Sequence, residues 1–160
     1  MAEKAYGYVG KIARINLTDK SVELIPTSKY VPKYIGGRSV CNKVFWDEVK
    51  PGIRAFDPES KLIYMTGPTT ATGIPTGGRT VFTGISPNSW PEQYTWSGIG
   101  GWFGAELKFA GYDGFILEGK AGGVCVGISG AGDGALTGYC SRRINGKKVR
   151  TRGYSAVSLS

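Results

Sequence analysis

The stretch PTGGRT at residues 75–80 contains the residue types that hold a phosphate group. Two glycines directly before Arg79 let the backbone approach a ligand closely, and a guanidinium binds phosphate oxygens through two parallel hydrogen bonds. Arg79 is also the only Lys or Arg between Lys61 and Lys108, so it stands alone in a loop rich in Gly and Thr. A single arginine after a turn is more often a solvated surface residue, and the local sequence leaves both interpretations open.

The stretch SGIGGWFG at residues 97–104 contains a second glycine turn, which leads into an amphipathic segment. Gly98, Gly100 and Gly101 either let a helix start close against a sheet or leave backbone N–H groups free for a phosphate. The local sequence favours neither role over the other. A dinucleotide-binding fingerprint is not favoured, because the preceding segment WPEQYTWS is a poor buried strand.

The composition excludes most self-contained catalytic sites. The 160-residue chain has no His, so it cannot contain a Ser-His-Asp triad, a Cys-His dyad or a His-ligated metal. Its three cysteines, Cys41, Cys125 and Cys140, form no CxxC pair, which indicates neither a disulfide framework nor a zinc site. Redox chemistry would therefore require a bound cofactor. No signal peptide or membrane-spanning apolar run is found, so a cytoplasmic location is expected.

The remaining polar and aromatic residues around the second turn predict no further site. Its four carboxylates form no obvious acid–base pair, and Glu106 and Lys108 are expected to be solvated on a helix surface. Three tryptophans recur every six residues; they are compatible with a cleft, but packing in the core is the favoured interpretation. The carboxylates are those of Glu92, Glu106, Asp113 and Glu118, and the tryptophans are Trp90, Trp96 and Trp102.

Hydrophobic periodicity predicts a mixture of strands and helices. Apolar and polar residues alternate on either side of Thr18-Asp19-Lys20, which predicts a β-hairpin. Apolar residues at helical spacing after residue 38 predict a helix that ends before Pro51-Gly52. A second helix is expected over about residues 103–110, and further strands over residues 62–65, 80–85 and 114–118.

Two segments of the chain are alike. IGGRSVCNKVFWDEV starts at residue 35 and IGGWFGAELKFAGYD at residue 99, and both read Ile-Gly-Gly followed by an amphipathic helix. Each follows strand-like sequence and precedes an apolar strand. We interpret this pattern as an internal duplication of a β-β-α-β type unit, which predicts an α+β fold with helices packed on sheet.

The character of the sequence changes near residue 121. Residues 122–160 have nine Gly and a net charge of +5 out of the total of +8, and this excess lies mainly in SRRINGKKVRTRG. VCVGI is expected to form a strand and the rest to be poorly ordered. We therefore divide the chain into a domain at residues 1–121 and a Gly-rich basic tail at residues 122–160. The tail supports an alternative function, a non-catalytic binding or assembly module that docks on an acidic partner; a nucleic acid is not favoured, because the body of the domain is not basic.

Five motifs then occur in a recognisable order: YGYVGKIARINLTDKSVEL, KYIGGRSV, DPESKLIYMTGP, GIPTGGRT and GGWFGAELKFAGYDGFILEGKA. Over about residues 6–121 they resemble the N-terminal domain of the aldehyde:ferredoxin oxidoreductases, the tungsten-pterin enzymes. The last motif is the most specific of the five. The resemblance implies a duplicated α+β domain built from two β-sheets with packed helices, which forms the base for a bis-pterin tungsten cofactor.

The resemblance also implies an activity for the full enzyme. Enzymes of this family oxidise aldehydes to carboxylic acids with water and pass two electrons through a [4Fe–4S] cluster to ferredoxin. Relatives include a molybdenum or tungsten reductase that acts on an aromatic acyl-CoA. The sequence does not separate tungsten from molybdenum, and it leaves open whether the full enzyme is a homodimer.

Four residues are expected to contact the cofactor on the strength of the resemblance. Arg79 matches the arginine of the family's PTGGR motif, which contacts the pterin. Gly98 stands where the family often has an Asn whose main-chain carbonyl helps hold a Mg²⁺ between the pterin phosphates. Gly100 matches the next contact, and the backbone at Gly100 and Gly101 would meet a phosphate.

The chain departs from the family in its length, because family members are several times longer. Their cluster cysteines and acid–base residues lie in later helical domains, and Cys41, Cys125 and Cys140 do not match the cluster pattern. The expectation is a fragment or truncated member that binds no [4Fe–4S] cluster and is inactive by itself.

Overall fold

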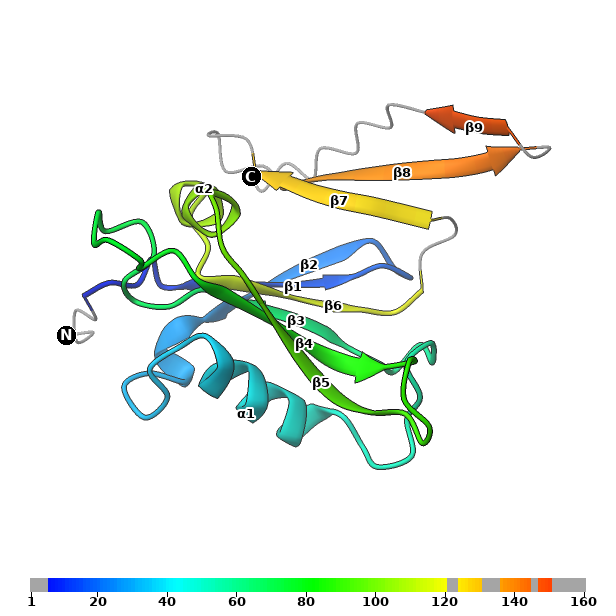
Figure 1. Cartoon of the computed structure of the whole chain (residues 1–160), viewed down its shortest axis with the longest axis horizontal. Coiled ribbons are helices and arrows are strands. Elements are labelled where there is room, and N and C mark those ends of the chain that lie inside the picture. Colours follow the sequence, from blue (N-terminus) through cyan, green and yellow to red (C-terminus); the bar gives the residue numbers. More distant parts are fainter. Residues whose placement is uncertain (1–5, 121–123, 131–135, 145–146, 151–160) are drawn as a thin grey trace.

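The computed structural model describes residues 6–120 with their side chains and the backbone of residues 124–130, 136–144 and 147–150 (Figure 1). The predicted hairpin, both helices and the three later strands are found close to their expected bounds. One strand, β5, was not predicted, because its residues are almost all exposed and lack the pattern of a buried strand. In chain order the elements are β1 (Lys11–Asn16), β2 (Ser21–Pro26), the short 3-10 helix η1 (Thr27–Lys29), α1 (Arg38–Glu48), β3 (Leu62–Met65), β4 (Thr80–Ser86), β5 (Gln93–Ile99), α2 (Phe103–Phe109) and β6 (Gly114–Glu118).

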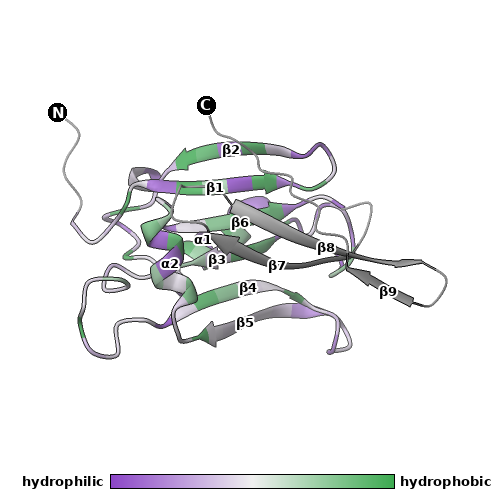
Figure 2. Cartoon of the chain, turned by 90° about the horizontal axis from the view of Figure 1, so that it is seen from above, coloured by the Kyte–Doolittle hydropathy of each residue, from purple (hydrophilic) through white to green (hydrophobic). Residues whose placement is uncertain are grey.

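These six strands form one mixed sheet in the order β2-β1-β6-β3-β4-β5. β1 and β6 are parallel, and every other neighbouring pair is antiparallel. The central strands β6 and β3 are continuous apolar runs because both of their faces are covered. Figure 2 shows the sheet from above, with β2 at one edge and β5 at the other.

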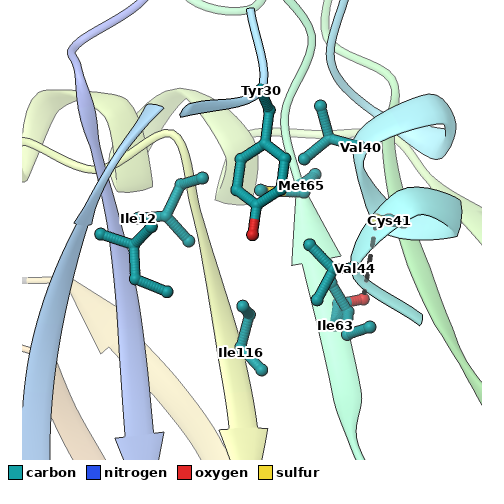
Figure 3. Packing of buried hydrophobic residues seen from close by; sticks show 9 residues of the cluster. Ile12, Tyr30, Val40, Cys41, Val44, Ile63, Met65 and Ile116 are labelled. Carbon is teal, nitrogen blue, oxygen red and sulfur yellow. Dashed lines mark hydrogen bonds between the residues drawn. The ribbon is translucent and has the colours of Figure 1, made fainter. Parts of the chain in front are cut away.

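Helix α1 covers one face of the sheet. Its buried residues Val40, Cys41 and Val44 meet Ile12, Ile63, Met65 and Ile116 from the central strands (Figure 3). The first and last of the helix residues lie four positions apart, which places all three on one side of the helix.

Helix α2 covers the opposite face of the sheet (Figure 1). There Leu107 and Ala110 pack with Tyr64 and Phe115, whose rings stack with centroids 4.9 Å apart. Alternation along β3 and β6 sends neighbouring side chains into the two cores, so the sheet lies between two helical layers. The predicted α+β class is therefore confirmed.

The two β-β-α-β segments, β1-β2-α1-β3 and β4-β5-α2-β6, have the same order of elements. If each strand is replaced by its counterpart in the other segment, the same strand order results, read from the opposite edge of the sheet. Their strand directions differ, however: β1 and β3 are antiparallel to each other, whereas β4 and β6 are parallel. No single rotation therefore relates the two copies, and the two Ile-Gly-Gly turns have different surroundings.

A second sheet has the order β7-β8-β9 and is antiparallel throughout. The sequence predicted one strand here, and the structure has three: β7 (Val124–Gly130), β8 (Leu136–Ile144) and β9 (Lys147–Arg150). Among the residues that the structure describes, no helix is long and apolar enough to cross a bilayer.

Candidate functional site

Arg79 and Gly98, 19 positions apart in the sequence, lie against each other. β4 and β5 form a hairpin in which Val81 is opposite Gly98, so the residue before β4 meets the end of β5. A Cβ placed on Gly98 would lie 3.2 Å from Nη1 and 3.6 Å from Cδ of Arg79. Glycine at position 98 therefore allows the arginine side chain to lie along the strand backbone.

The two glycine turns also lie side by side. A Cβ on Gly78 would lie 3.6 Å from the carbonyl oxygen of Gly101. Gly101 has φ +89°, a conformation that favours glycine, and a Cβ on Gly100 or Gly101 would meet no atom within 4 Å. The structure thus brings Arg79, Gly98 and the Gly100–Gly101 turn together at one end of the β4–β5 hairpin, with open space beside the turn.

Threonines fix the loop that carries Arg79. The hydroxyls of Thr69 and Thr70 both donate to the carbonyl of Gly77 at 3.3 Å, and the backbone N–H of Gly67 donates to Oγ1 of Thr70. A Cβ on Gly77 would lie 2.8 Å from the carbonyl oxygen of Thr69, so this crossing also requires glycine. Hydrogen bonds between the two ends of the loop therefore hold its shape just before Arg79.

Lys108 was predicted to be solvated. This prediction is wrong, because the residue is only 7% exposed. Its Nζ donates to the carbonyl oxygens of Gly7 at 2.6 Å and Gly67 at 2.7 Å. Burial lowers the pKa of this amine, and the nearby Asp113 opposes that shift. Since Gly67 starts the loop that leads to Arg79, Lys108 anchors that loop to α2. Glu106 is exposed, as expected.

Asp113 is a buried carboxylate that sequence analysis did not assign a role. It accepts hydrogen bonds from the backbone N–H groups of Val9 (2.9 Å) and Gly10 (2.7 Å) and from the hydroxyl of Thr27 (2.7 Å). Three donors from a distant part of the chain converge on it, so its role is to hold the N-terminal segment to the sheet. The only sequence signal was an acidic residue directly before a buried strand.

Gly104 decides how α2 starts. A Cβ there would lie 2.3 Å from Cγ2 of Thr80, 3.2 Å from Cγ2 of Thr70 and 3.3 Å from the hydroxyl oxygen of Tyr64. The last glycine of SGIGGWFG therefore serves close packing, whereas Gly98 and Gly101 shape the turn beside Arg79. Of the two roles that the sequence left open, close packing of the helix against the sheet belongs to Gly104.

The three tryptophans are exposed, which contradicts their predicted core packing. The exposed fractions are 86% for Trp90, 49% for Trp96 and 79% for Trp102. Trp96 lies on the edge strand β5, and Trp102 follows Gly101 directly. Exposed apolar side chains next to a candidate site are typical of a surface that contacts a ligand or another part of a protein.

The clearest ion-pair cluster lies away from this site. Arg14 contacts Glu48 at 2.6 Å and Glu118 at 3.3 Å, and Lys61 bridges the same two carboxylates. These groups border a hollow of about 460 Å³ that none of the four predicted contact residues lines. The cluster joins α1 to the sheet and includes none of the predicted contact residues.

Cys41 has the properties of a core residue. It is fully buried, and burial raises the pKa of its thiol to about 12. At pH 8 only about one in ten thousand of such thiols is ionised. We expect iodoacetamide to leave Cys41 unmodified in the native protein and to alkylate it in guanidinium chloride, as measured by peptide mass spectrometry. Alkylation of native Cys41 at the rate of a small-molecule thiol would contradict this assignment.

No group of three or more Cys, Asp or Glu suited to a metal occurs within the described residues.

Comparison with known proteins gives consistent matches. A family model described as "Aldehyde ferredoxin oxidoreductase, N-terminal domain" matches residues 12–131. Over 117 residues the chain is 44% identical to a tungsten-containing aldehyde ferredoxin oxidoreductase of Pyrococcus abyssi and 37% identical to that of Pyrococcus furiosus. Each alignment covers 72% of this chain and 19% of the relative, so the chain spans about a fifth of these relatives' length.

Two other matches have different names. An aliphatic sulfonate oxidoreductase, WOR-like subunit, of Pyrococcus furiosus is 36% identical over 120 residues. A solved structure, the active site complex BamBC of benzoyl coenzyme A reductase with 1,5-dienoyl-CoA, matches with a TM-score of 0.70 and 32% identity. That match covers 75% of this chain and 18% of the BamBC chain.

Proposed function

Because the chain belongs to the aldehyde ferredoxin oxidoreductase family through its N-terminal domain, we propose that it holds the phosphate groups of a tungsten bis-pterin cofactor at Arg79 and the Gly98–Gly101 turn. The observation that carries this proposal is the contact between Arg79 and Gly98 beside the open Gly100–Gly101 turn. The two stretches that contain the predicted contact residues, PTGGRT and SGIGGWFG, therefore lie together.

The donors at this place suit a phosphate. Arg79 presents a planar set of N–H donors, and among the described residues no carboxylate pairs with it. The turn at Gly100 and Gly101 adds backbone N–H groups without a Cβ to block an approaching ligand. A fixed arginine beside exposed backbone donors is a common form of phosphate recognition.

The groups at this place are not sufficient by themselves to bind a metal ion. The main-chain carbonyl of Gly98 is the one ligand that the resemblance assigns to Mg²⁺, and Mg²⁺ requires six oxygen ligands. In the full enzyme the main-chain carbonyl of Gly98 would therefore supply at most one ligand to Mg²⁺. The tungsten would be held by the sulfurs of the pterins.

The names of the relatives support a role shared by several reactions. They refer to aldehydes, an aliphatic sulfonate and benzoyl coenzyme A, yet all these proteins share this segment. A domain common to such different substrates is better suited to hold the cofactor than to select the substrate. When bound, the cofactor would supply the redox chemistry; Arg79 and the turn would fix its position.

For the whole protein we infer oxidation of an aldehyde to a carboxylic acid with ferredoxin as electron acceptor. The [4Fe–4S] cluster and the groups that move protons would belong to other domains, with the boundary of this one near residue 121. Cys41 is buried within its own core and is not available to a cluster.

The test of the proposed site uses Arg79→Gln in the full 160-residue chain, with inorganic pyrophosphate as the probe in isothermal titration calorimetry. We expect the affinity to fall about tenfold or more, because one hydrogen bond to a charged group contributes about 1.5–3 kcal/mol net. The matched control is Arg54→Gln, since Arg54 is an exposed arginine that pairs with Glu92 elsewhere on the surface. Equal affinities for Arg79→Gln and the wild type would refute the proposed site.

A further inference from the structure

Arg38 is a second arginine at the same edge of the sheet, and neither the sequence motifs nor the family resemblance assigned it a role. It is the first residue of α1, and its guanidinium carbon lies 4.4 Å from the ring centroid of Trp96 on β5. This distance is that of a cation–π contact, which fixes the direction of an otherwise flexible side chain.

Trp96 and Gly98 occupy adjacent positions on one face of β5. Side chains two residues apart in a strand point the same way and are separated by about 6.6 Å. Tyr94, which precedes Trp96 in this row, packs edge-on against Phe45 of α1 with ring centroids 4.8 Å apart. The row therefore faces α1, and the two arginines cover neighbouring positions in it: Arg38 at Trp96 and Arg79 at Gly98.

Neither of these two arginines is neutralised by a carboxylate within the described residues. Arg14 and Arg54, by contrast, form ion pairs with glutamates, and Lys43 and Lys61 pair with carboxylates as well. Two like charges that contact neighbouring positions of one row repel each other, and a bound anion between them would reduce that repulsion. The cation–π contact and the contact with the Gly98 backbone hold both side chains at this place.

We propose that Arg38, held by Trp96, is a second anion-binding residue of the Arg79 site and that the two guanidiniums share one phosphate or diphosphate group. The inference rests on the proposed phosphate-binding role of Arg79. Two guanidiniums bind a dianionic phosphate more strongly than one, because each supplies paired N–H donors to a different pair of oxygens. Trp96 acts through Arg38 as a positioning residue.

The competing interpretation is that Arg38 and Trp96 only fasten α1 to β5. The two interpretations differ in a measurable way. A fastening contact contributes to the free energy of unfolding and leaves anion affinity unchanged. An anion-binding arginine changes affinity, and the effect of Trp96 must then disappear once Arg38 is absent.

The experiment measures pyrophosphate affinity by calorimetry at low salt for the wild type, Arg38→Gln, Trp96→Ala and the double variant, with unfolding in urea measured in parallel. We expect about a fivefold loss for Arg38→Gln and about a threefold loss for Trp96→Ala. The double variant should bind no more weakly than Arg38→Gln, because the tryptophan acts only through the arginine. Arg54→Gln again serves as the control.

The outcomes separate this inference from the proposed function. If Arg79→Gln weakens binding while Arg38→Gln and Trp96→Ala bind like the wild type, the role of Arg38 is wrong and that of Arg79 stands. Wild-type affinity combined with reduced stability in Arg38→Gln would identify a fastening contact and likewise overturn the inference. If the wild-type chain binds no pyrophosphate, the proposed function fails together with it. Should Arg38→Gln not fold, Trp96→Ala alone decides, since unchanged affinity there contradicts the inference.

Discussion

Replacing Asp113 with Ala should lower the free energy of unfolding by about 4 kcal/mol, the largest effect that we expect of a single substitution outside the hydrophobic core. The carboxylate is 3% exposed and accepts hydrogen bonds from Val9, Gly10 and Thr27. Alanine would leave these three donors without their acceptor. It would also remove the negative charge near the buried amine of Lys108, which raises the cost further.

Unfolding in urea, followed by circular dichroism, measures this effect. Asp113→Asn should cost less, because the amide keeps one oxygen acceptor at nearly the same volume. Asp19→Ala, in the exposed turn between β1 and β2, should change stability by less than about 0.5 kcal/mol. If Asp113→Ala were as mild as Asp19→Ala, the N-terminal segment would not be held by this carboxylate.

Replacing Gly104 with Ala should destabilise the protein by about 2 kcal/mol through overpacking. The new methyl group would overlap Cγ2 of Thr80 at 2.3 Å. Thr80 cannot rotate away freely, because its hydroxyl accepts from Tyr64 and donates to the carbonyl of Ile99. Helix α2 would therefore shift away from the sheet, and the Gly100–Gly101 turn would shift with it.

Gly100→Ala is the matched control, since a Cβ there meets no atom within 4 Å and the backbone is not left-handed. We expect its free energy of unfolding to stay within about 0.5 kcal/mol of the wild type. Thermal and urea unfolding of both variants compares the two glycines directly. Equal stabilities for Gly104→Ala and Gly100→Ala would show that α2 does not need this close approach.

The composition of the candidate site was only partly predictable. Arg79, Gly98, Gly100 and Gly101 were all chosen from short motifs, and the structure brings them to one end of the β4–β5 hairpin. Their roles toward a cofactor remain a proposal. Arg38 was missed, because its partner Trp96 lies 58 positions away, on a strand whose exposed residues carry no periodic signal.

The predictions for Lys108 and for the three tryptophans failed for a common physical reason. Lys108 was expected in solvent and the tryptophans in the core, because Lys is usually exposed and Trp usually buried. The environment of a side chain depends on which segments pack beside it. Lys108 is buried because two backbone carbonyls, from Gly7 and Gly67, converge on its amine. Trp96 is exposed because β5 is the last strand of the sheet.

By itself the sequence determined the local structure and the family. Hydrophobic period, glycine turns and helix ends are properties of neighbouring residues, so they located both helices and five of the six strands of the main sheet. The ordered motifs over residues 6–121 indicated the family. The tertiary structure alone decided which face each helix covers, that β1 pairs with β6 in parallel, and that Arg38 and Arg79 contact neighbouring positions of β5. These features depend on contacts between residues far apart in the chain. The free energy of such contacts cannot be inferred from a local sequence pattern.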